Sequence, residues 1–158
     1  YQVMLLKNKM KYIISTIGKI RNNDEDLITR KYLKRIRSIE LKQYEVKTKN
    51  KEKRIEEEAD KLINSTPKDG KLILLDEEGE NISSSDLAKL ILNWNNSNIT
   101  SVNFAIGGAF GNGIKIKRTA DKIIALGRLT WPHQMVKMMI SEQIYRIETI
   151  IHGHPYHK

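Results

Sequence analysis

The sequence predicts an α/β domain with a mostly parallel sheet and helices on both of its faces. Short apolar runs alternate along the chain with segments of helical periodicity, which is the element order of such folds. The run KLILL at 71–75 is continuous rather than alternating, as is typical of a strand buried on both faces. With 158 residues, 39% of them hydrophobic, the chain can bury one sizeable core, so we expect a single domain.

The strands are expected where apolar runs end in turn residues. KYIISTIG is the first of them, with Ile13, Ile14 and Ile17 before a closing Gly18. KQYEVKT is the second, and PKDG forms a turn immediately before KLILL. SVNFAI and KIIAL complete the sheet. The five expected strands cover 11–18, 42–48, 71–75, 101–106 and 122–126.

The helices are expected between these strands. The acidic cluster NNDED begins the first, which continues through LITRKYLKRI and places acidic residues in its first turn and basic residues in its last. Ile55, Ala59 and Leu62 recur at helical spacing in the second, and serines cap the third. The expected helices cover 22–36, 51–65, 83–94, a short piece after 113, and about 133–151.

The charge is unevenly distributed. Residues 1–54 hold 16 Lys and Arg against 6 Asp and Glu, and residues 55–158 hold 12 against 13, so +10 and −1 give the net charge of +9. Clustered cations of this kind bind RNA phosphates without sequence preference, and they also occur on solvated helix faces. Both interpretations stay open, with Arg35 and Arg37 as candidate RNA contacts.

The composition excludes several classes of site. The absence of cysteine removes disulfides, thiolate zinc sites and cysteine nucleophiles. No apolar run approaches the roughly 18 residues of a membrane span, and the apolar stretch at the start is too short for a signal peptide. We therefore expect a soluble, cytosolic protein without a membrane partner.

Two loops are candidate ligand sites. GGAFGNG at 107–113 follows a strand, so its backbone can approach a ligand at the carboxyl end of the sheet, although its spacing does not match a dinucleotide loop and a simple tight turn is equally compatible. LGRLTWPHQM contains Pro132, which suits the first turn of a helix, and Thr130, which can help to satisfy the helix amides. His133 is then either a packed helix residue or part of a site.

The last helix and the tail carry further candidates. Glu142 and Arg146 are four residues apart and can pair on one face of a helix that is apolar on nearly every other side. That pair is either structural or leaves Arg146 to anchor a phosphate or carboxylate. The tail HGHPYHK holds three of the four histidines, yet no carboxylate lies within it to complete a metal shell, so no metal site is expected.

Several of these motifs together resemble one family. IGGAFGNG, LTWPHQM, EQIYR and the terminal PYHK, with MKYIISTIGKI and YLKRI before them, are similar in order and spacing to the large-subunit ribosomal RNA pseudouridine N3-methyltransferases of the SPOUT superfamily. The resemblance extends from Met10 to Lys158 as one domain and leaves residues 1–9 outside it. It implies a C-terminal trefoil knot, a homodimer and S-adenosylmethionine bound in the knotted loops.

The resemblance also implies site residues. It assigns cofactor binding to Leu75, Gly107, Leu126, Gly127, Arg128, Leu129, Thr130 and Trp131. The implied substrate is a pseudouridine of large-subunit ribosomal RNA, whose N3 proton must leave during methyl transfer. Tyr156 and His157 are the implied catalytic residues, since a histidine suits proton abstraction at neutral pH and a tyrosine can orient or relay. His152 and His154 are expected to be structural.

The resemblance also suggests substrate contacts, and the sequence departs from the family's motifs at two positions. The candidate substrate residues are Arg146, His133, Lys137, Arg35 and Arg37. Members of the family often have an arginine at the position of Lys137 and a smaller residue at that of Ile147, which bears on substrate docking more than on cofactor binding. The alternative functions are a catalytically silent RNA- or ribosome-binding module on the same fold and, less favoured, a flavodoxin-like nucleotide-binding protein.

Overall fold

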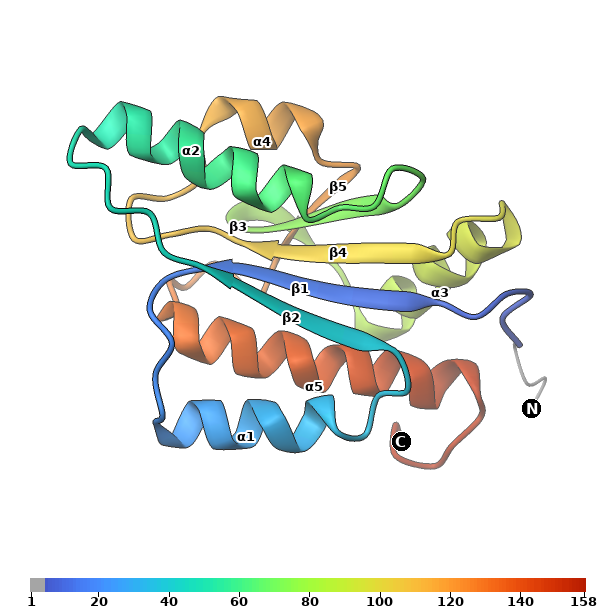
Figure 1. Cartoon of the computed structure of the whole chain (residues 1–158). Coiled ribbons are helices and arrows are strands. Elements are labelled where there is room, and N and C mark those ends of the chain that lie inside the picture. Colours follow the sequence, from blue (N-terminus) through green and yellow to red (C-terminus); the bar gives the residue numbers. More distant parts are fainter. Residues whose placement is uncertain (1–4) are drawn as a thin grey trace.

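The computed structural model describes residues 5–158 and contains one five-stranded sheet (Figure 1). Its strands are β1 (Lys11–Ile17), β2 (Ile39–Tyr44), β3 (Lys71–Asn81), β4 (Ser101–Ile106) and β5 (Lys122–Ala125). The order across the sheet is β2-β1-β4-β3-β5, and every neighbouring pair is parallel. The predicted α/β class with a parallel sheet is confirmed.

Helices cover both faces of this sheet (Figure 1). They are α1 (Asp24–Leu33), α2 (Lys51–Asn64), α3 (Ser84–Asn96), α4 (Ile114–Thr119) and α5 (His133–Ile151). One apolar core joins the sheet to α3 and α5 through residues such as Ile91, Ile140 and Ile144, and α1 packs on α5. A second core joins the opposite face to α2 and α4 through Leu62 and Ile116. The sheet is therefore buried on both sides, which explains its continuous apolar runs.

The starts of the first three helices follow from their capping residues. The side chains of Asn23, Asn50 and Ser83 each accept a hydrogen bond from the backbone amide three residues later, at 3.0 Å in every case. Such caps satisfy one of the amides that a helix start leaves without an intrahelical partner.

The second strand was predicted too late in the chain. It spans Ile39–Tyr44 rather than 42–48, because its ladder runs from Tyr12 opposite Ile39 to Ile17 opposite Tyr44 and ends where β1 ends. β2 lies at the sheet edge and is only partly buried, so its own apolar pattern is a weak guide to its bounds.

The third strand is longer than predicted and is interrupted. Ile124 of β5 lies opposite both Leu75 and Glu80, so residues 76–79 leave the ladder before β3 continues to Asn81. Pairing with β5 resumes at Glu80, and a Cβ atom on the preceding Gly79 would lie 2.6 Å from the carbonyl carbon of Ile124. Only glycine permits this approach, and the excursion contains the acidic residues 76–78.

The last helix is largely buried, as predicted. Ile140, Ile144, Ile147 and Ile151 face the core with no exposed surface, and no residue of α5 is fully exposed. Ile147 thus has a place in the core despite its size. Among the described residues, no helix is long and apolar enough to cross a membrane.

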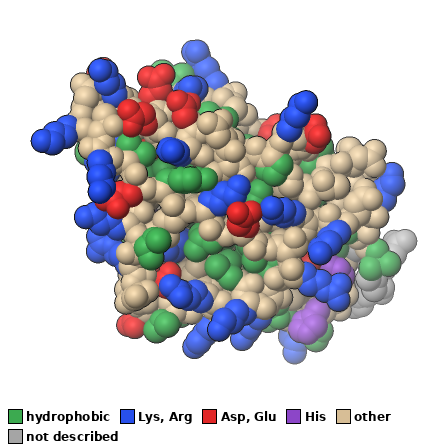
Figure 2. All heavy atoms as spheres, in the orientation of Figure 1, with side chains coloured by type: hydrophobic (Ala, Val, Ile, Leu, Met, Phe, Trp, Pro, Cys, Tyr) green, Lys and Arg blue, Asp and Glu red, His purple; other side chains and the backbone are tan. Residues whose placement is uncertain are grey.

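The segment expected to lie outside the family match is partly described. Residues 1–4 lie outside the described residues, whereas Asn8 exchanges two hydrogen bonds with the buried Asn95 of α3, at 3.0 and 2.9 Å. Figure 2 shows the surface in the orientation of Figure 1, with Lys and Arg side chains along the edge at which the strands end and α2 begins.

Candidate functional site

A cavity of about 610 Å³ opens at the carboxyl ends of β3, β4 and β5. Three segments line it: the excursion in β3, the glycine-rich loop after β4, and the connection from β5 into α5. The carboxyl edge of a parallel sheet is where such folds bind ligands. The lining residues are Leu75–Glu78, Ile106–Ala109, Gly111, Asn112, Lys117, Leu126, Gly127, Leu129–His133 and Val136.

Asn112 holds the glycine-rich loop against the end of β3. Its Nδ2 donates to the carbonyl of Leu75 at 3.1 Å and to Oδ2 of Asp76 at 2.8 Å. A Cβ atom on Gly107 would lie 2.1 Å from Oδ1 of Asn112, so this folded-back carboxamide requires glycine at position 107. The loop wall of the cavity is thereby connected directly to the neighbouring strand.

Glu58 of α2 packs against the same loop at Gly108. Only 3% of Glu58 is exposed, and a Cβ atom on Gly108 would lie 2.7 Å from its Oε2. Oε1 accepts from Nε of Arg54 at 2.9 Å, whereas Oε2 has no hydrogen-bond partner among the described residues. The Arg54 guanidinium carbon lies 5.1 Å from the centre of the Phe110 ring. One ion pair therefore contacts the loop at two points.

The connection from β5 into α5 closes another side of the cavity. The indole of Trp131 donates to the carbonyl of Leu126 at 3.0 Å, and the hydroxyl of Thr130 donates to Glu77. The sequence suggested that Thr130 helps to satisfy the amides of α5, but its hydroxyl bonds Glu77 instead. Pro132 holds the N-cap position, and no capping side chain among residues 5–158 bonds the first amides of this helix. Those amides remain available beside the cavity.

Acidic side chains form one rim of the cavity. Asp76, Glu77 and Glu78 all belong to the excursion in β3. Lys117 lies 3.6 Å from Asp76 and 3.1 Å from Glu78, and its hydrogen bond to Glu78 raises the pKa of its ammonium group. With three carboxylates and one lysine lining it, the cavity favours a ligand that carries positive charge.

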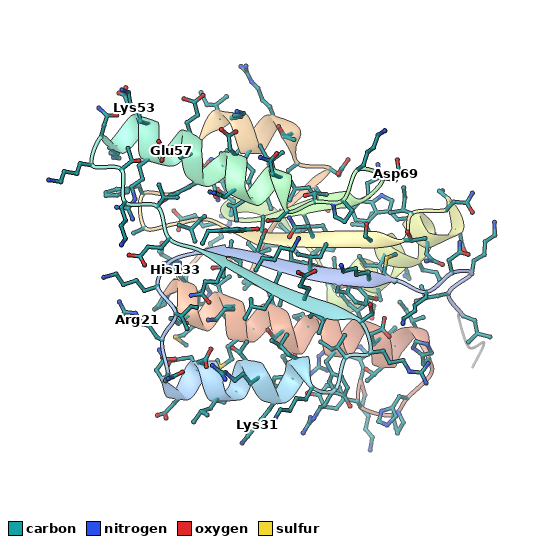
Figure 3. All side chains as sticks on the ribbon, in the orientation of Figure 1. Arg21, Lys31, Lys53, Glu57, Asp69 and His133 are labelled. Carbon is teal, nitrogen blue, oxygen red and sulfur yellow. The ribbon has the colours of Figure 1, made fainter. Side chains whose placement is uncertain are left out.

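His133 and Lys137 lie on successive turns of α5 in different settings. His133, labelled in Figure 3, stands at the start of α5 and is one of the residues that line the cavity. Burial, followed by the nearby charge of Lys137, lowers the pKa of its imidazole. The side chain of Lys137 is only 1% exposed and places Nζ 3.7 Å from Oδ1 of Asp26 in α1. Burial lowers the pKa of this amine. Lys137 was expected to contact substrate, but in this structure it faces the interior.

The C-terminal tail folds back onto the second half of α5. The hydroxyl of Tyr156 donates to Oε1 of Glu142 at 3.0 Å and lies 3.5 Å from the hydroxyl of Tyr32. The Tyr156 ring packs edge-on against that of Tyr145, with centroids 4.8 Å apart. We call the residues joined here the tail cluster; they are Tyr32, Glu142, Tyr145, Arg146, Tyr156 and His157.

The hydrogen bonds of the tail cluster indicate which ring nitrogen of His157 carries a proton and that Tyr156 keeps its hydroxyl proton. Arg146 donates twice to Oε1 of Glu142, at 2.6 and 3.0 Å, and its Nη1 lies 3.1 Å from Nδ1 of His157. A guanidinium has only donors, so Nδ1 accepts and the neutral ring carries its proton on Nε2. The hydrogen bond with Tyr32, with burial and Glu142 adding to it, raises the pKa of Tyr156, which therefore remains a hydroxyl at neutral pH.

The other two tail histidines have local partners. Nδ1 of His152 lies 2.8 Å from the carbonyl of Glu148, and Nδ1 of His154 accepts from the amide of Tyr156 at 3.2 Å. Gly153 between them has a φ of 68° and ends α5 in a left-handed conformation. Within residues 5–158, no group of three metal-ligating side chains is brought together.

Comparison with known proteins identifies the family. Residues 10–157 match a family model described as "Predicted SPOUT methyltransferase". The chain belongs to the SPOUT methyltransferase family. Relatives at 35% identity include proteins named "Ribosomal RNA large subunit methyltransferase H" from Paramagnetospirillum magneticum and Nitrobacter hamburgensis, with 94% of this chain and 99% of each relative aligned. A protein of the same name from Geotalea uraniireducens is 47% identical over 65% of this chain and 67% of its own length.

In this SPOUT methyltransferase, seven of the eight residues assigned to the cofactor border one cavity. They are Leu75, Gly107, Leu126, Gly127, Leu129, Thr130 and Trp131. Arg128 is exposed and does not line the cavity. The structure therefore brings together residues that are up to 56 positions apart, from 75 to 131.

Tyr156 and His157 of this methyltransferase lie away from the cavity. Their contacts on α5 are at Glu142 and Arg146, and the latter is 13 residues, or about 20 Å at 1.5 Å per residue, beyond His133. A second hollow of about 540 Å³ lies between the cavity and the tail cluster. Leu126 and Gly127 border both hollows, whereas Tyr32 and Glu142 of the tail cluster line only the second.

The remaining candidate contacts divide between the cluster and the surface. The Arg35 guanidinium carbon lies 5.5 Å from the ring centres of both Tyr32 and Tyr145, so Arg35 borders the tail cluster. Arg37 is exposed. Sequence reasoning missed the acidic rim, although three consecutive acidic residues directly after KLILL at a strand end are a visible signal. Asn112 and Glu58 left no such signal, because their roles depend on contacts between distant segments.

Proposed function

We propose that this protein uses S-adenosylmethionine to methylate N3 of a pseudouridine in large-subunit ribosomal RNA. The observation that carries the proposal is the convergence of three separate loops on one cavity, in a chain whose curated relatives are named as large-subunit ribosomal RNA methyltransferases. The remaining support comes from the fit of the cavity to the cofactor and from the chemistry of the tail.

The residues present suit this cofactor. The volume of about 610 Å³ falls in the usual range for small-molecule sites. S-adenosylmethionine carries a positive sulfonium and a positive ammonium, which the acidic rim of Asp76, Glu77 and Glu78 can stabilise. Its carboxylate can accept hydrogen bonds from the uncapped first turn of α5, and its adenine can bond backbone groups at the strand ends.

The chemistry then requires one proton transfer by the protein. S-adenosylmethionine supplies an electrophilic methyl group, and the target N3 must lose its imide proton to attack it. Tyr156 keeps its proton and donates to Glu142, the carboxylate that also binds Arg146 beside His157. His157 accepts a proton through Nδ1 only after Arg146 releases it. An RNA phosphate that recruits the Arg146 guanidinium frees Nδ1, so substrate binding itself prepares the base.

The distance between cavity and tail favours a homodimer. About 20 Å along α5 separates the helix turn beside the cavity from the residue that bonds His157. We propose that the tail of one subunit reaches the cavity of the other. Apolar side chains on this side of the molecule suit such an interface: Leu27 of α1 is 60% exposed, and Ile28, Met138 and Met139 line the second hollow.

The same family assignment leads us to propose a trefoil knot and a cytoplasmic site of action. The knot is supported by the order of the sheet, in which β5 pairs with β3 rather than β4, and by the change of face between α4 and α5 (Figure 1). A cytoplasmic location suits an enzyme whose substrate is ribosomal RNA. We assign no metal to the reaction.

One experiment separates this function from its rival, a silent RNA-binding module. Purified protein is incubated with tritiated S-adenosylmethionine and ribosomal subunits that lack the modification. Tritium on the pseudouridine supports the proposal. A protein that binds subunits but neither S-adenosylmethionine by calorimetry nor transfers label is the silent module.

A further inference from the structure

The glycine-rich loop presents a second face away from the cavity. Ala109 and Gly111 line the cavity, whereas Phe110 between them does not and leaves 46% of its surface exposed. An aromatic ring that is half exposed beside a ligand cavity is available to a partner, since burial of its apolar area is incomplete.

Two cationic side chains lie beside this ring. Nζ of Lys51 lies 5.8 Å and the guanidinium carbon of Arg54 lies 5.1 Å from its centre. Lys47, Lys49, Lys51 and Lys53 are all exposed, and none of them forms an ion pair with any of residues 5–158. Within residues 45–53 the exposed acidic side chains are Glu45 and Glu52, so the four exposed lysines outnumber them.

Three lysines of α4 and β5 differ from this group. Lys117, which lines the cavity, and Lys115 and Lys122, which lie in α4 and β5, each pair with a carboxylate. The lysines of residues 47–53 therefore keep charge that the fold does not use. Figure 2 shows basic side chains along this edge, and Figure 3 places Lys53 and His133 at the same edge of the molecule.

The position of Phe110 is held from within. Arg54 contacts the ring and pairs with Glu58, and the carboxylate of Glu58 lies directly beneath Gly108. The loop is thus supported on the side opposite its exposed ring. A ring held in place loses little conformational freedom when a partner stacks on it.

We propose that Phe110 together with Lys47, Lys49, Lys51 and Lys53, here called the Phe110 surface, binds a single-stranded segment of the RNA substrate beside the target nucleotide. An unstacked base packs on the ring while neighbouring phosphates contact the lysines, which is the general mode of single-strand binding. This inference rests on the proposed function, because the RNA must reach the adjoining cavity. According to this inference, the single-stranded RNA segment binds at the start of α2 and the glycine-rich loop, and not at Arg35.

The test uses Phe110→Ala and the double variant Lys51→Glu/Lys53→Glu. A matched control, Lys9→Glu/Lys68→Glu, makes the same charge change at exposed lysines near the amino ends of β1 and β3. For each protein we measure KM and kcat with unmodified ribosomal subunits at two salt concentrations, the Kd for S-adenosylmethionine, and direct binding to a fluorescent single-stranded oligoribonucleotide. The direct binding arm needs no turnover, so it remains informative if the wild-type protein is inactive.

The Phe110 surface predicts a KM and an oligoribonucleotide Kd raised by roughly tenfold in both variants, with unchanged affinity for S-adenosylmethionine. For the double variant, the slope of log binding constant against log salt concentration should also fall by about one to two released ions. The inference is overturned if both variants bind the oligoribonucleotide like wild type, or if the control loses as much. Loss of subunit binding with intact oligoribonucleotide binding assigns the surface to a ribosomal protein and overturns it as well. Wild-type protein that binds RNA through this surface yet transfers no methyl group refutes the proposed function alone.

Discussion

Nη1 of Arg146 lies 3.1 Å from Nδ1 of His157, so the only imidazole nitrogen able to accept a proton is already bonded. The same guanidinium pairs with Glu142, which also accepts from Tyr156. The tail is therefore held in an arrangement in which the hydroxyl of Tyr156 donates to Glu142 and Nδ1 of His157 accepts from Arg146. The base function proposed for His157 therefore requires that Arg146 release Nδ1.

Deleting Tyr156–Lys158 is expected to abolish methyl transfer while leaving the affinity for S-adenosylmethionine unchanged, since the cavity lies about 20 Å along α5 from Arg146. His157→Ala should lower kcat by roughly 10²-fold, the usual effect of losing a positioned base. Tritium transfer to unmodified subunits measures both. The His152→Ala/His154→Ala double variant is the control and should stay near wild type; an active truncation contradicts the role of the tail.

Mixing two impaired proteins, at a cofactor concentration that Gly107→Val cannot use, tests whether the tail acts on the other subunit. The truncated protein keeps an intact cavity, and a Gly107→Val protein keeps an intact tail. If subunits exchange and the tail works in trans, a refolded mixture should regain up to about one quarter of wild-type activity, because half of the dimers are mixed and each has one complete site. Activity no greater than the sum of the two separate proteins indicates a tail that serves its own chain.

Gly107→Val is expected to weaken S-adenosylmethionine binding by at least about tenfold, or roughly 1.4 kcal/mol, measured by calorimetry. The structure gives this effect a specific route, because the added Cβ meets Oδ1 of Asn112 and displaces the carboxamide from Leu75 and Asp76. Adding Asn112→Ala separates the routes. If affinity returns in the double variant, the clash with Asn112 was the cause; continued loss indicates that valine occupies the cofactor volume, and unchanged affinity in the single variant removes the loop from the site.

Arg37→Glu should raise the KM for ribosomal subunits and flatten its salt dependence by about one ion without affecting cofactor affinity. Arg37 is the informative position, since Arg35 also stacks near Tyr32 and Tyr145 and its reversal disturbs the tail cluster. Lys68→Glu, at the amino end of the sheet, supplies the matched control. Equal kinetics for both variants would mean that Arg37 belongs to a solvated helix connection.

Lys137→Met should leave the protein at least as stable as wild type at neutral pH, because an isosteric apolar side chain replaces a buried charge and Asp26 keeps its 2.7 Å bond to Arg30. Burial lowers the pKa of Lys137, so between that value and about 10.5 the unfolded chain binds more protons than the folded one. The free energy of unfolding of wild type should therefore rise with pH in this window, and that of the variant should rise less. Denaturant unfolding at several alkaline pH values measures the free energy of unfolding of both proteins. If it changes with pH equally in wild type and Lys137→Met, the pKa of Lys137 is not lowered by folding.

Much of the fold was predictable from local sequence. Continuous apolar runs such as KLILL predicted strands buried on both faces, and NNDED and SSSD predicted helix starts, because caps and buried runs depend on neighbouring residues. Of the candidate site, the glycine-rich loop and the stretch 126–131 were predictable for a related reason. Both follow strands of a parallel sheet, and the carboxyl ends of such strands share one edge.

The tertiary structure alone decided which of these residues meet. Nothing local shows that residues 76–79 leave the ladder at Ile124 and form an acidic rim, that Glu58 lies under Gly108, or that Lys137 is buried against Asp26. Each depends on two segments that are far apart in the chain, and contact between such segments is set by packing of the whole core rather than by local periodicity. The environment of His157 is of the same kind: its sequence position made it a candidate base, whereas the structure shows that its Nδ1 already accepts a hydrogen bond from Arg146.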